Sequence, residues 1–327
     1  MDLSNVGLKH YTTQYPKLQE LATQENLGRI FSEHKTDWDM VTASGPIKGI
    51  ILTTMRQKTL PADLPKVGDW VVYEIIPGER KAKILRTLPR YSVLSRFKIK
   101  DEAEQIIAAN IDLMFLVLSV DQIYNAMQLN RYLTIAQNGG ITPVIVINKT
   151  DKARGANSLA GGIKKLHPTL KIISTSAKTK IGLQELERNI SAGQTAVLVG
   201  NSGAGKSSIV NALLADSRQA TKNVGNEGRG RHTTTRREMF VLPNGGVVID
   251  TPGMRTLETS KSSGSIFSEL EVLSRNCKFR NCDHIKSSGC ALQKALVEKT
   301  ITEKQLQQFI ALTNSPTPRP SYHKSSR

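Results

Sequence analysis

The residues best suited to chemistry form a glycine-rich segment that ends in a lysine and two serines. Gly200, Gly205, Lys206 and Ser207 fit the pattern Gly-x4-Gly-Lys-Ser/Thr, which is typical of loops that bind nucleotide phosphates. Glycines let backbone N–H groups converge on phosphate oxygens, and the N-terminus of the following helix adds partial positive charge. We expect Lys206 to bridge the β and γ phosphates and the Ser207 hydroxyl to bind Mg²⁺. The predicted nucleotide contacts of this loop are Gly200, Asn201, Ser202, Gly203, Ala204, Gly205, Lys206, Ser207 and Ser208.

A second group of residues could read a guanine base. A carboxylate at Asp151 can accept hydrogen bonds from the N1–H and the exocyclic amine of guanine, and adenine lacks this pair of donors. A buried acceptor without a partner is costly, so adenine nucleotides should be rejected. We expect Asn148 to brace neighbouring loops and the Ala177 N–H to donate to guanine O6. The predicted base contacts are Asn148, Lys149, Thr150, Asp151, Ser176, Ala177 and Lys178.

A third group could hold Mg²⁺ and sense the γ-phosphate. Asp250 ends the apolar run 246–249 and begins the motif Asp-Thr-Pro-Gly, in which the Gly253 N–H would meet the γ-phosphate. One of the three threonines at 233–235 should complete the Mg²⁺ shell when GTP is bound, and we choose Thr234. The expected Mg²⁺ ligands are therefore Ser207, Asp250 and Thr234.

The position after Gly253 bears on hydrolysis. Many GTPases place a glutamine there to orient the attacking water, but this chain has Met254, whose thioether cannot position water usefully. We therefore expect slow intrinsic hydrolysis. His232 is the candidate catalytic residue, because an imidazole can orient or activate water. The alternative is that His232 is a solvated side chain in a basic loop.

The three cysteines of the chain lie close together and share their segment with a histidine. Cys277, Cys282, His284 and Cys290 offer three thiolates and one imidazole, a complete tetrahedral set for a structural Zn²⁺ ion. The alternatives are scattered buried cysteines or a disulfide. The odd number of cysteines and the histidine among them argue against a disulfide framework.

The order of these motifs is unusual. An ordinary GTPase begins with the phosphate loop and ends with the base-reading loops, whereas here the base-reading segment at 148–151 precedes the phosphate loop at 200–208. The order predicts a circularly permuted GTPase. Both motifs follow apolar runs that suit buried parallel strands, and a helical pattern follows the phosphate loop, as the chemistry requires.

The wider pattern predicts a multidomain α/β protein. Short β-like runs at 47–52, 70–76, 83–85 and 91–94 favour a small N-terminal β-barrel of the OB or SH3-like kind. A circularly permuted P-loop GTPase domain should follow, and an α-helical zinc-binding domain should end the fold. The expected ranges are 1–32 for a polar N-terminal extension, 33–100 for an OB-like barrel, 101–262 for the GTPase domain, 263–313 for the zinc-binding domain and 314–327 for a flexible tail.

The net charge of +17 points to a nucleic-acid partner. Residues 1–110 carry +3, whereas residues 111–270 carry +8 and residues 271–327 carry +6. The alternative is that the charge only serves solubility. Aromatic residues make up 5% of the chain, so phosphate contacts are better candidates than base stacking. No apolar run approaches membrane-spanning length and no signal peptide is evident, so we expect a cytoplasmic protein without a membrane partner. We also expect a monomer.

Together these features resemble the small-ribosomal-subunit-dependent GTPase family of the RsgA or YjeQ type. The resemblance rests on the β-rich N-terminal region, the permuted motif order, the segment 230–235 and the Cys-x4-Cys-x-His-x5-Cys spacing. It implies an OB-fold, binding of GTP and GDP, and binding to the small ribosomal subunit and its rRNA. It also implies late small-subunit maturation, GTP hydrolysis stimulated by that subunit, and a catalytic role for His232.

Two other functions compete with an RNA-stimulated GTPase. Met254 favours a GTP-dependent RNA-binding scaffold with little turnover. A metabolic nucleotide kinase would need a second substrate pocket, and no motif suggests one. We also expect GTP to order the threonine cluster and the segment 250–253, and so to reposition the basic zinc domain against RNA.

Overall fold

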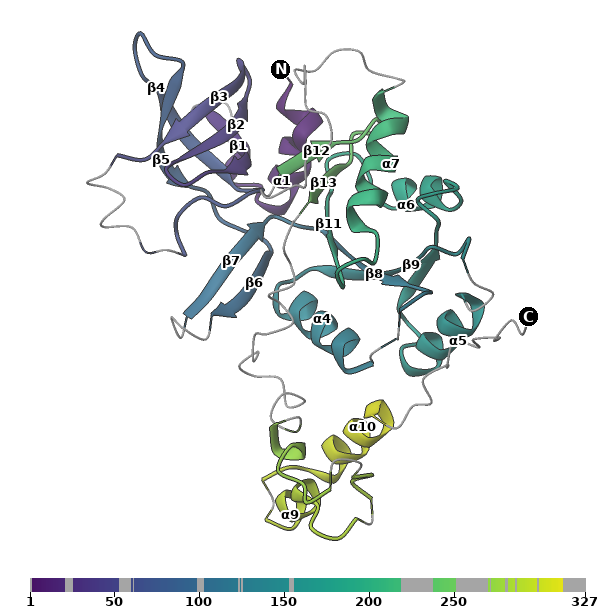
Figure 1. Cartoon of the computed structure of the whole chain (residues 1–327). Coiled ribbons are helices and arrows are strands. Elements are labelled where there is room, and N and C mark those ends of the chain that lie inside the picture. The colour runs from purple at the N-terminus through teal and green to yellow at the C-terminus, as the bar shows by residue number, and fades with distance from the viewer. Residues whose placement is uncertain are drawn as a thin grey trace.

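The computed structural model of the chain describes a β-rich N-terminal part, a central α/β part and a small helical C-terminal part (Figure 1). The described residues are 2–20, 26–52, 60, 62–98, 103–122, 124, 126–152, 156–218, 238–250, 270, 272–279, 282–285, 287–298 and 300–313. Among these residues, no helix combines the length and the apolar character needed to cross a membrane.

Five strands of the N-terminal part close into a barrel. They are β1 (Leu27–Glu33), β2 (Asp37–Thr42), β3 (Gly45–Ile50), β4 (Trp70–Ile75) and β5 (Lys81–Thr87). Their order is β1-β2-β3-β5-β4, and β4 pairs back with β1 to close the ring. β3 and β5 run parallel while the other neighbours run antiparallel, which is the Greek-key arrangement of an OB-fold. The predicted OB-like barrel is confirmed.

The first barrel strand, β1, begins at Leu27, before the boundary at residue 33 that the sequence pattern suggested. Four consecutive residues from Leu27 to Ile30 are buried, so the strand lacks the apolar–polar alternation that marks a half-exposed strand. Leu27 packs with the N-terminal segment and Ile30 packs inside the barrel, so both faces of β1 are covered.

The N-terminal segment packs against the barrel instead of extending from it. It contains the 3-10 helix η1 (Leu3–Val6) and the helix α1 (Leu8–Gln14). Tyr11 is 2% exposed, its ring lies 5.7 Å from that of Trp70, and its hydroxyl donates to the Pro89 carbonyl at 2.7 Å. The expected polar extension is therefore largely a structural element, because a few apolar residues in it find a partner surface that its sequence does not reveal.

Arg29 of β1 ties the N-terminal segment, the barrel and the α/β part together. Its side chain is 2% exposed and lies over the Trp70 ring at 5.5 Å. Its Nη1 donates to the Val6 carbonyl at 2.5 Å, and its Nη2 donates to the Thr195 hydroxyl at 2.7 Å. A charge held in this way must find its partners within the protein, so Arg29 fixes three segments at one point.

Asp112 makes a second connection close to the first. One carboxylate oxygen accepts from the Thr195 backbone N–H at 2.7 Å, and the other lies 2.7 Å from His10 Nε2. The Tyr91 hydroxyl lies 3.2 Å from Asp112 Oδ2. Thr195 thus receives contacts from both networks at the start of the strand that leads to the phosphate loop.

A two-stranded hairpin follows the barrel. It consists of β6 (Val93–Lys98) and β7 (Ala103–Ala109). The run 91–94 that we expected in the barrel lies partly in β6, which pairs with β7. Leu94 and Ala108 are fully buried with Met114 and Leu129 in the core of the α/β part. The hairpin therefore packs with the α/β part. The run 91–94 is too short to indicate which part of the protein it packs against.

The α/β part is a mainly parallel sheet with helices on both faces. Its strands are β8 (Leu113–Ser119), β9 (Thr142–Asn148), β10 (Lys171–Ser174), β11 (Thr195–Val199), β12 (Glu238–Val241) and β13 (Val247–Asp250). They lie in the order β10-β9-β8-β11-β13-β12, and β12 is antiparallel to β13. At Ser32 and Glu238 the sheet continues from β12 into β1 of the barrel.

Alternate residues of β8 point to two separate cores, which explains its uninterrupted apolar sequence. Met114 and Leu116 pack in one core with α4 and α5, and Phe115 and Val117 pack in the other with α6 and α7. The four helices are α4 (Ala126–Asn138), α5 (Ala156–Leu166), α6 (Leu183–Arg188) and α7 (Lys206–Arg218).

The C-terminal part contains the helices α9 (Ala291–Val297) and α10 (Glu303–Thr313) around a core of its own. Leu270, Leu292 and Phe309 are each at most 1% exposed. In Figure 1 this part lies at the bottom, and α10 contacts α4 of the α/β part. The multidomain fold expected from the sequence is confirmed, and the exact domain ranges stay predictions.

Candidate functional site

The phosphate loop joins β11 to α7 and depends on glycine at two close approaches. Gly200 has φ of 141°, and a Cβ there would lie 2.2 Å from the Val117 carbonyl oxygen. Gly205 has φ of 95°, and a Cβ there would lie 2.3 Å from Asn148 Nδ2. Any other residue would push the loop away from β8 or from the base-reading segment. The glycines of the motif thus let the loop curve and also let it approach β8 and Asn148 closely.

Lys206 and Asp250 lie at the same edge of the sheet. Lys206 Nζ donates to the carbonyls of Gly200 at 2.7 Å and Asn201 at 2.8 Å, so its ammonium group lies over the loop. Asp250 ends the neighbouring strand β13 and is 5% exposed. Burial raises the pKa of Asp250, and the positive charge of Lys206 partly opposes this rise. A cation bound beside Asp250 would favour its ionised form in the same way.

Asn148 connects the three loops that form the nucleotide site. Its side chain is buried at the end of β9, where Nδ2 donates to the Ala204 carbonyl at 2.9 Å. Its Oδ1 accepts from the Ala177 backbone N–H at 3.2 Å. One amide therefore joins the phosphate loop to both base-reading segments, which is the bracing role expected from the sequence. Such a shared partner fixes the distance between the phosphate and base subsites.

Asp151 projects toward solvent beside the second base-reading segment. The Ser176 hydroxyl donates to Asp151 Oδ1 at 2.5 Å, and this bond lowers the pKa of the Asp151 carboxyl. Thr150 ties the two base-reading segments together, because its hydroxyl donates to the Thr175 carbonyl at 3.1 Å. Asp151 is thus held as an exposed carboxylate, the form that accepts two hydrogen bonds from guanine.

Asp121 is a member of the site that sequence reasoning missed. It follows β8, and Lys149 Nζ lies 3.1 Å from each of its carboxylate oxygens. The Ser119 hydroxyl also donates to Asp121, and with Lys149 and Lys152 it lowers the pKa of Asp121 to about 2. The ionised Asp121 therefore holds the Lys149 stem, which we expected to lie against the base. A lone aspartate after a strand gives no signal in the sequence.

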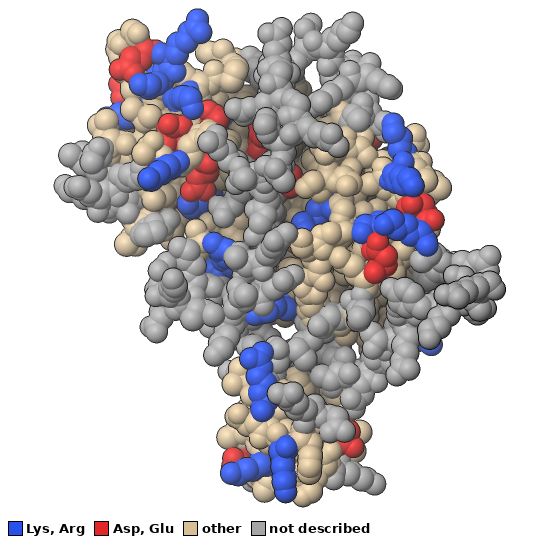
Figure 2. Space-filling model, in the orientation of Figure 1, with Lys and Arg blue, Asp and Glu red and all other residues tan. Residues whose placement is uncertain are grey.

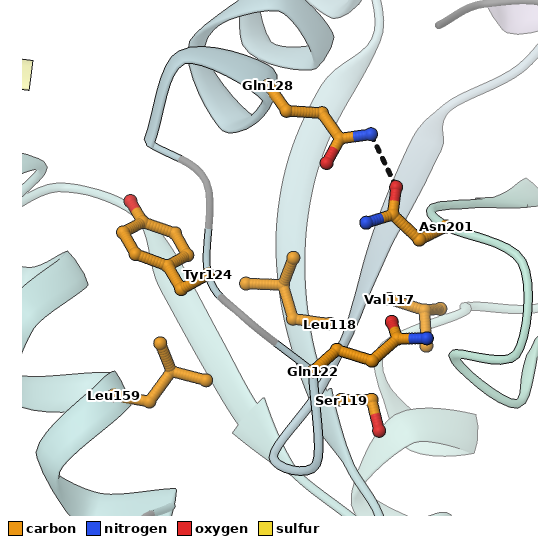
Figure 3. A pocket seen from close by; sticks show the side chains of 8 residues that line it. All are labelled: Val117, Leu118, Ser119, Gln122, Tyr124, Gln128, Leu159 and Asn201. Atoms are coloured by element: carbon orange, nitrogen blue, oxygen red, sulfur yellow. Dashed lines mark hydrogen bonds between the residues drawn. The ribbon is translucent and has the colours of Figure 1, made fainter. Parts of the chain in front are cut away.

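Two glutamines beside the phosphate loop were also missed. Gln122 Nε2 donates to the Ser202 carbonyl at 2.8 Å, and Gln128 Nε2 donates to Asn201 Oδ1. Figure 3 shows both amides pointing toward the loop across a small cavity that Tyr124 also lines. Glutamine is common in loops and helices, so only the fold reveals these contacts.

Several predicted site residues lie outside the described residues. These are His232, the threonines at 233–235 with the chosen Thr234, Gly253 and Met254. Their roles therefore stay predictions. The described structure brings together the remaining nucleotide residues from the ends of β9, β10, β11 and β13, which is the carboxyl edge of the parallel sheet.

The three cysteines and His284 converge in the C-terminal part. Their four ligand atoms lie within 4.8 Å of one another, with His284 Nδ1 at 3.6 Å from Cys277 Sγ and 3.5 Å from Cys290 Sγ. A tetrahedral zinc ion with Zn–S bonds of about 2.3 Å needs ligand atoms about 3.7 Å apart, so the donor set fits the ion. The geometry is compatible with the predicted structural zinc site.

Neighbouring groups hold these ligands in place. The Ala291 N–H at the start of α9 lies 3.3 Å from Cys277 Sγ, and Gln293 Nε2 donates to the His284 carbonyl at 2.7 Å. His284 has φ of 61°, a left-handed conformation that turns the chain sharply between ligands. The His284 ring also packs edge-on against Phe309 of α10 at 5.6 Å. The cluster is therefore joined to the core of the C-terminal part.

We expect the purified chain to carry one zinc ion, and Cys290→Ser to lose it. Cys290 is 5% exposed, and a serine hydroxyl there is a poor zinc ligand. Elemental analysis after gel filtration measures the zinc content, and limited proteolysis reports whether the C-terminal part loosens. Ser288→Ala, at an exposed position near the cluster, is the matched control and should keep the metal. Full zinc retention by Cys290→Ser would contradict this ligand set.

Comparison with known proteins places this geometry in a family. A family model described as RsgA GTPase matches residues 87–260. The chain is 36% identical over 293 residues to a protein of Lactiplantibacillus plantarum named small ribosomal subunit biogenesis GTPase RsgA 2, covering 88% of this chain and 83% of that protein. It is 38% identical over 292 residues to the protein of Methanosarcina acetivorans named small ribosomal subunit biogenesis GTPase RsgA, covering 88% of this chain and 78% of that protein.

Two solved structures share the fold. YjeQ from Thermotoga maritima aligns with a TM-score of 0.55 at 24% identity, covering 89% of this chain and 100% of that chain. YloQ, described as a circularly permuted GTPase, aligns with a TM-score of 0.52 at 22% identity, covering 88% of this chain and 94% of that chain. The permuted order of the site and the extended match to curated relatives lead to one conclusion: the chain belongs to the RsgA GTPase family and is a GTP hydrolase.

Proposed function

We propose that this protein binds the small ribosomal subunit and its rRNA, hydrolyses GTP slowly alone and faster on the subunit, and assists late maturation of that subunit. The observation that carries the proposal is the match to relatives named small ribosomal subunit biogenesis GTPase over 88% of this chain. The barrel, the nucleotide site and the metal module, by which we mean the Cys3His cluster with α9 and α10, lie within one chain. We place this activity in the cytoplasm and propose that the protein acts as a monomer.

Positive charge supports an RNA partner. The net charge is +17, and Lys and Arg side chains gather on the C-terminal part at the bottom of Figure 2. Among the described residues of that part, Arg275, Lys278 and Lys294 are exposed. Such groups bind phosphates without reading a base sequence, and their contribution falls as salt rises.

The residues of the nucleotide site have separate proposed roles in binding and hydrolysis of GTP. Lys206 and the backbone N–H groups of the loop hold the β and γ phosphates, and Asp151 selects guanine over adenine. Ser207, Asp250 and Thr234 are the proposed Mg²⁺ ligands, and Mg²⁺ supplies positive charge to the phosphates during transfer. His232 is the proposed residue that orients the attacking water, in place of the glutamine that Met254 replaces.

GTP turnover with purified ribosomal subunits tests the proposal. We expect slow turnover by the protein alone, a rise of at least about 10-fold with small subunits and no rise with large subunits, because a single bound partner can supply or order a catalytic group worth this much. Small-subunit stimulation should also fall as salt rises. His232→Ala should lose most of the stimulated turnover while it keeps GTP affinity.

A GTP-dependent RNA-binding scaffold is the second candidate, and Met254 favours it. The same assay separates the two, because a scaffold binds small subunits in a GTP-dependent way without faster turnover. Equal turnover with either subunit, or with none, would overturn the stimulated hydrolysis proposed here. Unchanged stimulated turnover in His232→Ala would remove that residue from the mechanism alone.

A further inference from the structure

Two glutamines outside the GTP-binding motifs of this chain hold the phosphate loop through hydrogen bonds. Gln122, in the loop after β8, donates through Nε2 to the Ser202 carbonyl at 2.8 Å, and its Nε2 lies 3.3 Å from where a Cβ of Gly203 would be. Gln128, in the first turns of α4, donates to the Asn201 side chain. The two amides thus contact adjacent residues of the phosphate loop from two different structural elements (Figure 3).

The helix that carries Gln128 is also the helix that the C-terminal part contacts. α10 lies against α4, and Phe309 of α10 packs against the ring of the metal ligand His284 at 5.6 Å. Phe309 is 1% exposed, so its place depends on the order of the surrounding core. A continuous series of contacts therefore runs from the metal cluster through α10 and α4 to the phosphate loop.

α4 can carry a displacement to the loop because a helix moves as a unit. It packs on the sheet through Leu129, Tyr132 and Ala136, which lie on its buried face, whereas Gln128 meets the phosphate loop at its N-terminal end. A small cavity between Gln128, Tyr124 and Leu159 leaves space beside this contact. A small shift of α4 would therefore alter the Gln128–Asn201 contact, and a hydrogen bond weakens as its geometry departs from the preferred distance and angle.

We propose that Gln122 and Gln128 are positioning residues for the phosphate loop, and that Gln128 makes nucleotide affinity depend on the integrity of the metal module. The two contacts have separate roles. Gln122 holds the loop from the segment that follows β8 and does not belong to α4, whereas Gln128 belongs to α4, which α10 contacts. The coupling rests on the packed contacts that run from the metal cluster through α10 and α4 to the phosphate loop.

Equilibrium binding of a fluorescent GDP analogue to the full-length protein tests both parts. The titrations are run with zinc bound and after treatment with a zinc-preferring chelator, in excess Mg²⁺ throughout. Gln122→Leu and Gln128→Leu should each weaken GDP binding by about three- to ten-fold, the value of one net hydrogen bond. Chelation should weaken GDP binding by a similar factor in the unmodified protein and in Gln122→Leu, and should have no further effect in Gln128→Leu.

Gln122→Leu is the matched control, because it removes the same kind of amide contact to the phosphate loop from a residue outside α4. Thermal unfolding of each variant checks that the fold is intact. Phe309→Leu, measured with zinc bound, gives a second route if the chelated protein aggregates. It should weaken GDP binding in the unmodified background and not in Gln128→Leu.

Two results would overturn the proposal. GDP affinity unchanged in both glutamine variants would remove their positioning role. The coupling would be refuted if chelation did not change the GDP affinity of the unmodified protein. It would also be refuted if chelation weakened GDP binding equally in Gln128→Leu. The assay contains no ribosomal subunit, so either failure leaves the proposed ribosomal function standing, and failure of subunit stimulation leaves this coupling standing.

Discussion

Asp151→Asn should lower GTP affinity by about 10²- to 10⁴-fold and should create measurable affinity for xanthosine triphosphate. In the proposed contact the carboxylate accepts from the N1–H and the exocyclic amine of guanine, and each such charge-assisted bond contributes about 1.5–3 kcal/mol. An asparagine still accepts from N1–H but presents an N–H to the position of the amine. Xanthine carries a carbonyl oxygen at that position, which can accept a hydrogen bond from the asparagine N–H. The guanine amine is a donor and cannot accept this hydrogen bond.

This change should leave the fold intact. Asp151 is exposed, and the Ser176 hydroxyl that donates to it at 2.5 Å can donate to an amide oxygen instead. Competition titrations with GTP and xanthosine triphosphate measure the change of preference. Asp63→Asn, an identical change at an exposed position in the barrel region, should bind GTP normally. Full GTP affinity in Asp151→Asn would mean that another group reads the base.

Arg29→Met should lower the free energy of unfolding by about 3–5 kcal/mol, a large share of the stability of any domain. Methionine fills similar space but leaves the Val6 and Gly68 carbonyls and the Thr195 hydroxyl without their donor. Burial lowers the pKa of Arg29, which shows that its charge is costly to hold there. Removing the buried charge is favourable by itself, but the loss of its hydrogen bonds outweighs that gain. Each buried group left unpaired costs about 1–3 kcal/mol.

Urea denaturation followed by circular dichroism measures this loss, and limited proteolysis shows whether the N-terminal segment detaches first. Arg80→Met removes an exposed arginine in the turn between β4 and β5 and should change stability by at most about 0.5 kcal/mol. If Arg29→Met unfolds at the same urea concentration as the unmodified protein, the buried guanidinium does not hold the three segments together.

The parts of the fold that the sequence predicted share one property, which is that local pattern determines them. The phosphate loop sits between a buried strand and a helix, as its glycine spacing and flanking residues required. The metal ligands converge because their short spacing leaves the chain few other arrangements. Asn148 follows a buried apolar run and lies between the loops that it was expected to brace.

The parts that the sequence did not predict depend on distant partners. Arg29 looks like an exposed strand residue until Val6 and Thr195 surround it. The run at 91–94 looks like another barrel strand until β7 pairs with it. Gln122 and Gln128 carry no chemical signal of their own, and only the arrangement of β8 and α4 brings them to the phosphate loop. Except for the β6–β7 hairpin, the deciding contact joins residues that are far apart along the chain.

The permuted order also sets the sequence in which the sheet can assemble on a translating ribosome. Among the strands of the α/β part, β8, β9 and β10 leave the exit tunnel first. The partner of β8 on its other side is β11, which is made only after α5, β10 and α6. Until β11 arrives, one edge of the apolar strand β8 exposes unpaired backbone groups, and such edges invite pairing with other chains. We therefore expect the nascent protein to be most prone to aggregation until the strand that leads to the phosphate loop inserts beside β8.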